Sequence, residues 1–283
     1  MKTAFILYKK EDAAINRVLI AKYFAALRAM GIRPGLVISD RLGYGEVFDL
    51  VRGAGFVINR TRDHGLAAFL ESRGVFVSNP AVTNETANDK LLTYLRLSSV
   101  APMLETRLLP REGEPPFPYP FVAKPAAGHG GKGVSMIRNA EDLAAFREAC
   151  GEKAVAQPAA SELGRDMRVY VVGGKPAAAM LRESDTDFRS NFSLGGRARF
   201  VPLSELAPDE LSIVEAVSAA LPLHYAGVDI MRDNGRAILN EIEDPVGARM
   251  LYINTAADPA LMHAAFAKAL AERLDEKNKT PEV

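Results

Sequence analysis

The sequence predicts an α/β protein with an N-terminal parallel α/β lobe followed by two α+β lobes. Near the start of the chain, short apolar runs alternate with segments of helical period, which is the pattern of a parallel sheet with crossover helices. A polar connection punctuated by prolines, at residues 102–120, separates this region from mixed strands and helices. With 283 residues, of which 48% are hydrophobic, the chain is long enough to bury a sizeable core.

The first lobe is expected at residues 1–82. Because strand-like and helix-like segments alternate there, its strands should run parallel in one sheet. The pattern predicts strands at residues 3–8, 34–39, 56–59 and 75–78 and helices at residues 13–30, before Gly55 and at residues 65–72.

Two further lobes are expected at residues 83–157 and 158–274, followed by a polar tail at residues 275–283 with the composition of a disordered segment. The smaller lobe is predicted to have one long helix from Asn84, strands at residues 121–124, 134–137 and 154–157, and a helix at residues 141–149. The larger lobe is predicted to have strands at residues 167–172, 177–181, 228–231 and 237–242 and helices at residues 208–221 and 259–274.

Composition and charge favour small-molecule chemistry. Lys+Arg and Asp+Glu are equal at 35 each, so no net field draws the molecule toward nucleic acid or a membrane surface. Cys150 is the only cysteine, which excludes an intramolecular disulfide, and the four histidines lack zinc-ligand spacing. The apolar run at residues 3–8 is too short for a signal peptide or a membrane span. We therefore expect a cytoplasmic protein.

A glycine-rich loop at residues 125–133 follows the strand predicted at residues 121–124. Lys124 ends the strand, and Gly130 and Gly131 lie in the loop. Glycines allow backbone N–H groups to turn toward an anion, and the nearby ammonium adds charge, so the loop is a candidate phosphate site. The alternative is a flexible hairpin with a solvated lysine. A Walker A loop is excluded because a strand, not a helix, follows.

Carboxylates gather on two predicted strands near the end of the larger lobe. Glu241 and Glu243 are two residues apart and therefore project from the same face of their strand, and Asp229 lies on another strand. Carboxylate oxygens are suitable ligands for Mg²⁺. The alternative for each residue is the polar face of an amphipathic strand.

A polar stretch at residues 182–199 combines arginines with the pair Gly195 and Gly196. Arginine binds phosphate oxygens with two parallel hydrogen bonds, and the glycines allow movement, so the stretch is a candidate lid. The alternative is a mobile surface loop. The arginines concerned are Arg182, Arg189, Arg197 and Arg199.

Taken in order along the chain, these segments resemble the ATP-grasp superfamily, especially the branch of the α-L-glutamate ligases and lysine-biosynthesis ligases. The resemblance covers most of residues 84–250, and residues 1–82 are similar to the pre-ATP-grasp domain. It implies an ATP-grasp fold whose two α+β lobes clamp ATP. The matching motifs are NDK at 88–90, FVAKPAAGHGGKGV at 121–134, AQP at 156–158, GRDMRVYVVGGK at 164–175, DFRSNFSLGG at 187–196, AGVDIM at 226–231 and NEIEDPVG at 240–247.

The resemblance also implies roles for individual residues. Without it, Lys90 would be taken as a lysine on a helix surface, and Arg168 as a partner of Asp166 in an ordinary strand ion pair. The implied nucleotide contacts are Lys90, Lys124, Gly130, Gly131 and Gln157. The residues implied near the reaction centre are Arg168, Arg189 and Asn191. The implied ligands of one or two Mg²⁺ ions, with Mn²⁺ as an alternative, are Asp229, Glu241 and Glu243.

Two positions depart from the usual pattern of this branch. The last motif usually reads Glu-x-Asn followed by Ser-Pro-Gly, whereas here Glu243 replaces the asparagine and Asp-Pro-Val-Gly follows at residues 244–247. Glutamate still suits Mg²⁺, but the altered residues change the neighbouring pocket. Pro158 stands where an acidic residue is common, so only the adenine-side role of Gln157 is expected to transfer.

The resemblance implies an ADP-forming carbon–nitrogen ligase that activates a carboxylate as an acyl phosphate and joins it to an amine. The expected substrate is an amino acid or is peptide-like, and a peptide or protein tail is included among the possibilities. Arg249 is a candidate for binding the substrate carboxylate, with a structural salt bridge as the alternative. Two rival functions are an ATP-grasp kinase or another ATP-dependent enzyme that makes no amide, and an inactive nucleotide-binding module. The joint presence of three carboxylates and Arg189 favours an active enzyme.

Overall fold

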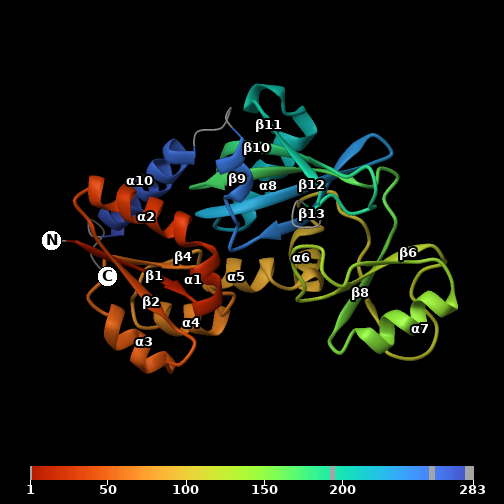
Figure 1. The fold of residues 1–283 in the computed structure, drawn as a ribbon, viewed down its shortest axis with the longest axis horizontal. Coiled ribbons are helices and arrows are strands. Elements are labelled where there is room, and N and C mark those ends of the chain that lie inside the picture. Colours follow the sequence, from red (N-terminus) through yellow and green to blue (C-terminus); the bar gives the residue numbers. More distant parts are fainter. Residues whose placement is uncertain (1, 192–194, 255–258, 278–283) are drawn as a thin grey trace.

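The computed structural model describes residues 2–191, 195–254 and 259–277, which form three separate sheets with helices packed on them. Figure 1 shows the first sheet and its helices on one side, the small sheet with α7 on the other, and the five-stranded sheet between and above them. The predicted lobe boundaries at residues 82, 157 and 274 stay predictions. None of the helices in the described ranges is long and apolar enough to cross a bilayer.

The first sheet is parallel, with strand order β2-β1-β3-β4, as the alternating pattern predicts. Its elements are β1 Thr3–Tyr8, α1 Lys10–Ile15, α2 Arg17–Ala29, β2 Arg33–Ile38, α3 Tyr44–Val51, β3 Phe56–Asn59, α4 His64–Glu71 and β4 Val77–Ser78. The prediction of one helix at residues 13–30 was wrong. The side chain of Asn16 donates to the carbonyl of Asp12 at 2.8 Å and interrupts the helix, because asparagine competes for backbone hydrogen bonds.

The single helix predicted from Asn84 is also two helices, α5 Ala81–Ala87 and α6 Lys90–Leu97. The carboxylate of Asp89 starts the second helix by accepting hydrogen bonds from the N–H groups of Leu91 and Leu92 at 2.9 and 3.0 Å. This N-cap places Lys90 at the first position of α6, beside the glycine-rich loop.

The small sheet has strand order β5-β8-β6-β7 and is antiparallel throughout. Its elements are β5 Arg107–Leu109, β6 Phe121–Pro125, β7 Ser135–Ile137, α7 Ala140–Ala149 and β8 Ala154–Pro158. The strand β5 was not predicted from the sequence. It has only three residues, of which two are exposed, so it carries no apolar alternation.

The five-stranded sheet has the antiparallel order β11-β10-β9-β12-β13. The elements of this region are β9 Arg165–Val172, β10 Lys175–Glu183, β11 Arg197–Val201, a 3-10 helix Leu203–Glu205, α8 Pro208–Ala220, β12 Tyr225–Asp233, β13 Arg236–Glu243, α9 Arg249–Ile253 and α10 Pro259–Lys277. Because α10 continues to Lys277, the prediction of a disordered tail from residue 275 was wrong for its first residues; residues 278–283 lie outside the described ranges.

The first sheet and the five-stranded sheet share one hydrophobic core. Tyr23 of α2, Tyr225 of β12 and Phe266 of α10 meet there, and all three are almost completely buried. Figure 1 shows α10 beside α2. The small sheet has a separate core with α7, in which Phe121 and Leu143 are buried. The described residues therefore form four apolar cores: the shared core, the core of the small sheet, and one further core on each of the two larger sheets.

Asn79, directly after β4, connects the first lobe to the end of β13. Its amide donates to the Tyr225 carbonyl at 2.8 Å and to Asp244 at 2.9 Å, and its oxygen accepts from the N–H groups of His224 and Tyr225 at 2.7 and 3.0 Å. The residue is 3% exposed. Water does not reach these buried groups. If the Asn79 side chain is removed, water therefore cannot take over the hydrogen bonds that it makes to the Tyr225, His224 and Asp244 groups.

We predict that Asn79→Ala lowers the free energy of unfolding by about 3 kcal/mol, because it leaves several buried polar groups without partners. Asn139→Ala is the matched control. Asn139 caps α7 with one hydrogen bond to Asp142 N–H at 2.8 Å, and its loss should cost about 1 kcal/mol. Urea unfolding measures both values, and equal losses in the two variants would contradict the assigned role of Asn79.

Candidate functional site

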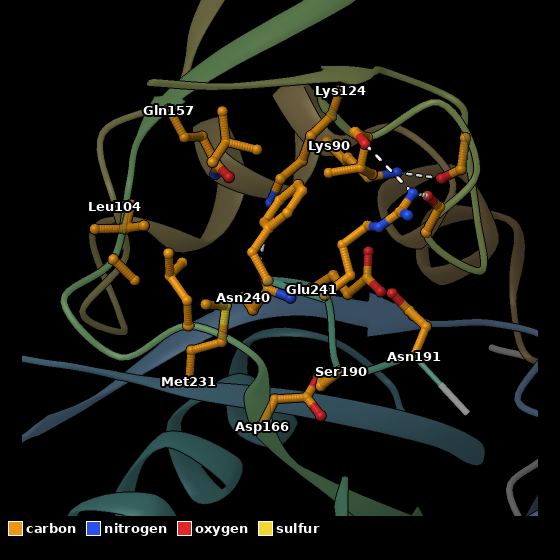
Figure 2. Close-up of a pocket in the computed structure, with 18 of the residues that line it drawn as sticks. Lys90, Leu104, Lys124, Gln157, Asp166, Ser190, Asn191, Met231, Asn240 and Glu241 are labelled. Carbon is orange, nitrogen blue, oxygen red and sulfur yellow. Dashed lines mark hydrogen bonds between the residues drawn. The ribbon is translucent and has the colours of Figure 1, made fainter. Parts of the chain in front are cut away.

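A first cavity lies between the small sheet and the five-stranded sheet (Figure 2). Its lining is apolar in one part, with Leu104 and Met231, and Gln157 of β8 lies beside them. The other part is charged and carries Lys90 of α6, Lys124 of β6, and Glu241 of β13. A cavity with an apolar part and a charged part suits a ligand with a flat apolar group and an anionic group.

Lys90 and Lys124 approach the charged part of this cavity from different elements. Burial lowers the pKa of Lys124 to about 8, against the opposing charge of Glu241. Its ammonium lies 3.4 Å from the side-chain oxygen of Asn240. The ammonium of Lys90 donates to the carbonyl of Gly128. The structure thus brings together in one cavity two lysines from different elements of the chain.

The glycine-rich loop bends through left-handed backbone conformations. Gly130, Gly131 and Gly133 have φ angles of +66°, +74° and +70°, which side chains with a Cβ rarely adopt. Arg189 reaches this loop from the other lobe and donates to the carbonyls of Gly131 and Val134 at 3.1 and 3.4 Å. The loop is therefore shaped by its glycines and contacted across the cavity by an arginine.

The candidate lid is only partly a loop. Arg189 pairs with Asp187 at 2.6 Å and lies in the segment that connects β10 to β11. The prediction that Arg182 belongs to this polar loop was wrong, because it lies in β10 and is 3% exposed. Arg197 and Arg199 belong to β11, where they alternate with less polar residues and keep their charges in solvent. Residues 192–194 of the motif lie outside the described ranges.

The predicted metal-ligand residues lie close together. One oxygen atom from each of Asp229, Glu241 and Glu243 lies within 4.8 Å of the others. The register of the sheet explains this, because Asp229 of β12 is directly opposite Glu241 of β13. Burial raises the pKa of Glu241, and the charges of Asp229 and Glu243 add to this effect against the opposing charge of Lys90.

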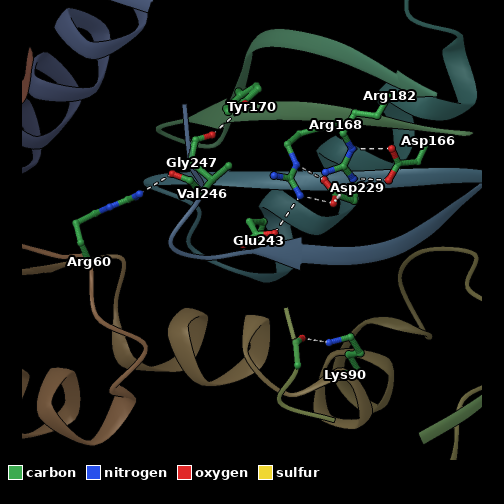
Figure 3. A network of polar contacts seen from close by, with 11 residues as sticks. Arg60, Lys90, Asp166, Arg168, Tyr170, Arg182, Asp229, Glu243, Val246 and Gly247 are labelled. Carbon is green, nitrogen blue, oxygen red and sulfur yellow. Dashed lines mark hydrogen bonds and ion pairs between the residues drawn. The ribbon is translucent and has the colours of Figure 1, made fainter. Parts of the chain in front are cut away.

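Asp229 is the centre of a buried ion network (Figure 3). It accepts from Arg168 at 2.7 and 2.6 Å and from Arg182 at 2.6 Å. Burial alone would raise the pKa of Asp229, but the two guanidinium charges outweigh it and lower the pKa to about 2. Arg168 also donates to Glu243 at 3.0 Å, and Arg182 pairs with Asp166. The simple Asp166–Arg168 pair considered from the sequence is therefore replaced by cross-strand pairs.

These residues fit a divalent cation. The donors are all carboxylate oxygens, which magnesium prefers, and a buried glutamate beside two other carboxylates gains from a positive charge placed among them. Glu241 and Glu243 face the cavities, whereas Asp229 is completely buried and already accepts from two arginines. The two glutamates are thus the more accessible ligands.

A second cavity adjoins the first. His129 and Asn191 line both, Glu241 lines only the first, and Glu243 only the second. The second cavity also contains Arg249, which is exposed and whose guanidinium has neither a hydrogen bond nor an ion pair with another residue of the described ranges. The structural salt bridge considered from the sequence for Arg249 is therefore not found in the described part of the chain.

Several site residues were missed in the sequence. Arg60 and Arg62 follow β3 and line the second cavity, together with Asp12 of α1. The carboxyl ends of parallel strands in open α/β sheets are a common place for ligands, and this rule could have identified both arginines. Asn240 was given no role, although it is the first residue of the motif NEIEDPVG that carries the family resemblance.

Gln157 lines the first cavity, although its amide nitrogen already donates a hydrogen bond within the protein. Its nitrogen donates to the hydroxyl of Thr106 at 2.7 Å, and the residue is 6% exposed. Pro158 ends β8 and also lines the cavity. The adenine contact stays a prediction. Cys150 lines neither of the two cavities.

Comparisons with known proteins agree with the fold. A probable alpha-L-glutamate ligase of Picosynechococcus is 34% identical over 146 residues, which are 50% of this chain and 48% of that protein. A probable alpha-L-glutamate ligase of Xanthomonas campestris is 30% identical over 194 residues, 63% of this chain and 64% of that protein. The chain thus spans about half to less than two thirds of the length of these curated relatives.

Solved structures show the same fold at low sequence identity. A RimK domain protein ATP-grasp from Sphaerobacter thermophilus has a TM-score of 0.71 at 17% identity, covering 96% of this chain and 99% of its own. A D-alanine–D-alanine ligase from Bacillus anthracis has a TM-score of 0.74 at 15% identity, covering 99% of both chains. A model of the RimK-like ATP-grasp domain matches residues 109–264, more than half of the sequence. The protein belongs to the RimK-like ATP-grasp family and has the ATP-grasp fold.

Proposed function

We propose that the protein is an ADP-forming ligase that uses ATP and Mg²⁺ to join a carboxylate to an amine through an acyl phosphate. The observation that carries this proposal is the pair of adjoining cavities, which share His129 and Asn191 and are each lined by one glutamate of β13. A nucleotide in the first cavity and an acid in the second would meet at these shared residues. The metal-ligand candidates lie beside that meeting point.

The lining of the first cavity supports ATP as its ligand. Leu104 and Met231 offer apolar surface for adenine, and Gln157 lies beside them. Lys90, Lys124 and the glycine-rich loop offer positive charge and backbone N–H groups for the phosphates. Arg189 lies over the loop, where the terminal phosphate of such a nucleotide would be placed.

Glu241 and Glu243, with Asp229 as a third donor, would hold magnesium, which neutralises phosphate charge and orients phosphate oxygens. Arg168 is a positioning residue in this proposal, because its guanidinium holds Asp229 and Glu243 in place. Arg168 is buried, and its positive charge is already balanced by the carboxylates of Asp229 and Glu243.

The proposed reaction has two steps. An oxygen of the substrate carboxylate attacks the γ-phosphorus, the bond to the β–γ bridging oxygen breaks, and ADP leaves. The amine then attacks the carbonyl carbon and loses a proton, and phosphate leaves with the former carboxylate oxygen. Asn191 and Arg189 would orient the transferred group, and neither step needs a nucleophilic side chain.

The names of the relatives support an amino acid or peptide-like substrate, since they describe a glutamate ligase and a D-alanine–D-alanine ligase. The second cavity supports an acidic substrate, because it is rich in arginine. The identity of the acid and the amine can be found by measuring ADP release with amino acids, hydroxy acids and dipeptides.

We predict that the affinity for Mg²⁺-ADP is constant below pH 8 and falls above it. Free protein loses the ammonium of Lys124 as the pH rises through about 8, whereas bound phosphate keeps this lysine charged to higher pH. The fall should be up to about tenfold between pH 8 and pH 9. Calorimetric titration at pH 7, 8 and 9 measures it. Lys124→Met should bind Mg²⁺-ADP weakly, and its affinity should not fall between pH 8 and pH 9. Lys132→Met changes an exposed lysine of the glycine-rich loop and should show the affinity and pH dependence of wild type.

Glu241→Gln and Glu243→Gln should each raise the Mg²⁺ concentration for half-maximal ADP release roughly tenfold or more, because each removes a ligand charge. Their affinity for ADP without Mg²⁺ should change much less. Glu215→Gln serves as the control, since Glu215 is an exposed residue of α8. Superimposable Mg²⁺ titrations of the glutamate variants and wild type would reject these ligands.

The mechanism predicts that one carboxylate oxygen of the substrate appears in inorganic phosphate. With the acid from the screen labelled with oxygen-18, mass spectrometry should find labelled phosphate and ADP when the amine is present. Retention of all label in the organic product, or formation of AMP and pyrophosphate, would refute the proposal. A stable phosphorylated product that forms equally well without amine would instead indicate a kinase.

A further inference from the structure

His129 of the glycine-rich loop lies where the two cavities meet. Among the residues that the structure describes, only His129 and Asn191 line both cavities. The proposed reaction places the acyl phosphate at this boundary, so these two side chains are beside the carbon that the amine attacks. The amide of Asn191 is not a base, whereas a neutral imidazole has a ring nitrogen that accepts a proton.

The backbone around His129 is held on both sides, and its ring stays accessible. The ammonium of Lys90 donates to the carbonyl of Gly128, and the N–H of Lys132 donates to the carbonyl of His129 at 3.4 Å. The residue itself is exposed. The imidazole can therefore contact a ligand in either cavity and also exchange protons with water.

The surroundings of the imidazole favour its neutral form. Partial burial lowers the pKa of His129, and the positive charges of Arg62 and Lys90 lower it further. The charge of Glu243 and a backbone hydrogen bond with Ala127 oppose this effect without overcoming it. A histidine with a lowered pKa is uncharged at neutral pH, and it is then able to take up a proton.

The carboxylates of the two cavities are less suitable as proton acceptors for the amine. Glu243 lines only the second cavity and accepts a hydrogen bond from Arg168 at 3.0 Å. Glu241 lines only the first cavity and is a proposed magnesium ligand. Asp12 lines only the second cavity, in which it lies 3.9 Å from Arg62. None of the three is shared by both cavities.

We infer that His129 is a catalytic residue that removes a proton from the ammonium group of the incoming amine. This rests on the proposed function, in which an amine attacks an acyl phosphate. The amine of an amino acid or peptide is largely protonated at neutral pH, and it has no lone pair for attack until a proton is lost.

The protons and bonds of this step balance. A ring nitrogen of His129 takes one proton from the ammonium group, and the freed lone pair forms the bond to the carbonyl carbon. The bond from that carbon to the phosphate oxygen then breaks, and its electron pair stays on the oxygen. The second proton of the amine nitrogen leaves with the phosphate. The imidazolium returns its proton to water, which the exposed ring reaches.

The test compares amines that need this step with a nucleophile that does not. Hydroxylamine is uncharged at neutral pH and attacks acyl phosphates directly to give hydroxamates. The full chain, in excess over Mg²⁺-ATP, is mixed at pH 7 with the amino acids, hydroxy acids and dipeptides of the ADP-release screen, with and without hydroxylamine. Mass spectrometry follows the amide in a single turnover, and the colour with ferric iron measures the hydroxamate.

His129→Gln should form the amide about 100-fold more slowly than wild type, whereas its rate of hydroxamate formation should stay within about threefold. His129→Asn gives the same test should His129→Gln fail to fold. His64→Gln is the matched control, because His64 is an exposed histidine at the start of α4 and lines neither cavity. It should form both products at the rates of wild type.

The outcomes separate the inference from the proposed function. An equal loss of amide and hydroxamate in His129→Gln would mean that His129 only binds or positions the acyl phosphate, and it would overturn the inference. Normal rates of both products in this variant would also overturn it, while ADP and amide from wild type would leave the proposed function standing. If wild type releases no ADP with any of these compounds, the proposed function itself fails, and the inference fails with it.

Discussion

The buried ion network centred on Asp229 is the interaction on which the candidate site depends. Arg168 and Arg182 donate to it from two neighbouring strands of the five-stranded sheet, and no part of Asp229 is exposed to solvent. Taking a charge out of water costs several kcal/mol, so each member of such a network is stable only while its partners are present. One consequence is that Glu243, which Arg168 also contacts, is held in position before any ligand binds. Arg168 and Arg182 are therefore paired with protein carboxylates, whose positions they fix, and other residues must bind the substrate.

The lobes differ in how firmly they are joined. The first sheet and the five-stranded sheet share a core that includes Tyr23 and Phe266, so moving them apart would expose large apolar surfaces. The small sheet has its own core, and its contacts across the first cavity include polar ones, such as the hydrogen bonds from Arg189 to the glycine-rich loop. Polar contacts near water are weaker than apolar burial. We therefore expect the small sheet to move relative to the other two when the first cavity opens.

Asp244 gives a structural reason for one departure from the usual motif of the α-L-glutamate ligase branch. Its two carboxylate oxygens accept from Asn79 and Asn84, and its backbone carbonyl accepts from Asn88. Serine at this position would offer a single oxygen. The acidic residue thus connects the first lobe to the end of β13. Arg60, which donates to the carbonyl of Val246, reinforces the same junction (Figure 3).

The sequence by itself determined the strongly apolar strands, because Thr3–Tyr8 and Phe56–Asn59 are short apolar runs of the length that is typical of buried strands. It also determined the order of motifs that implies the ATP-grasp fold. Short or half-exposed elements such as Arg197–Val201 could not be predicted, because they carry no periodic signal. Only the tertiary structure decided which charges meet. The partners of Arg182 and the exposure of Arg62 to the second cavity depend on strand register and on packing between lobes, and both bring together residues that are distant in the sequence.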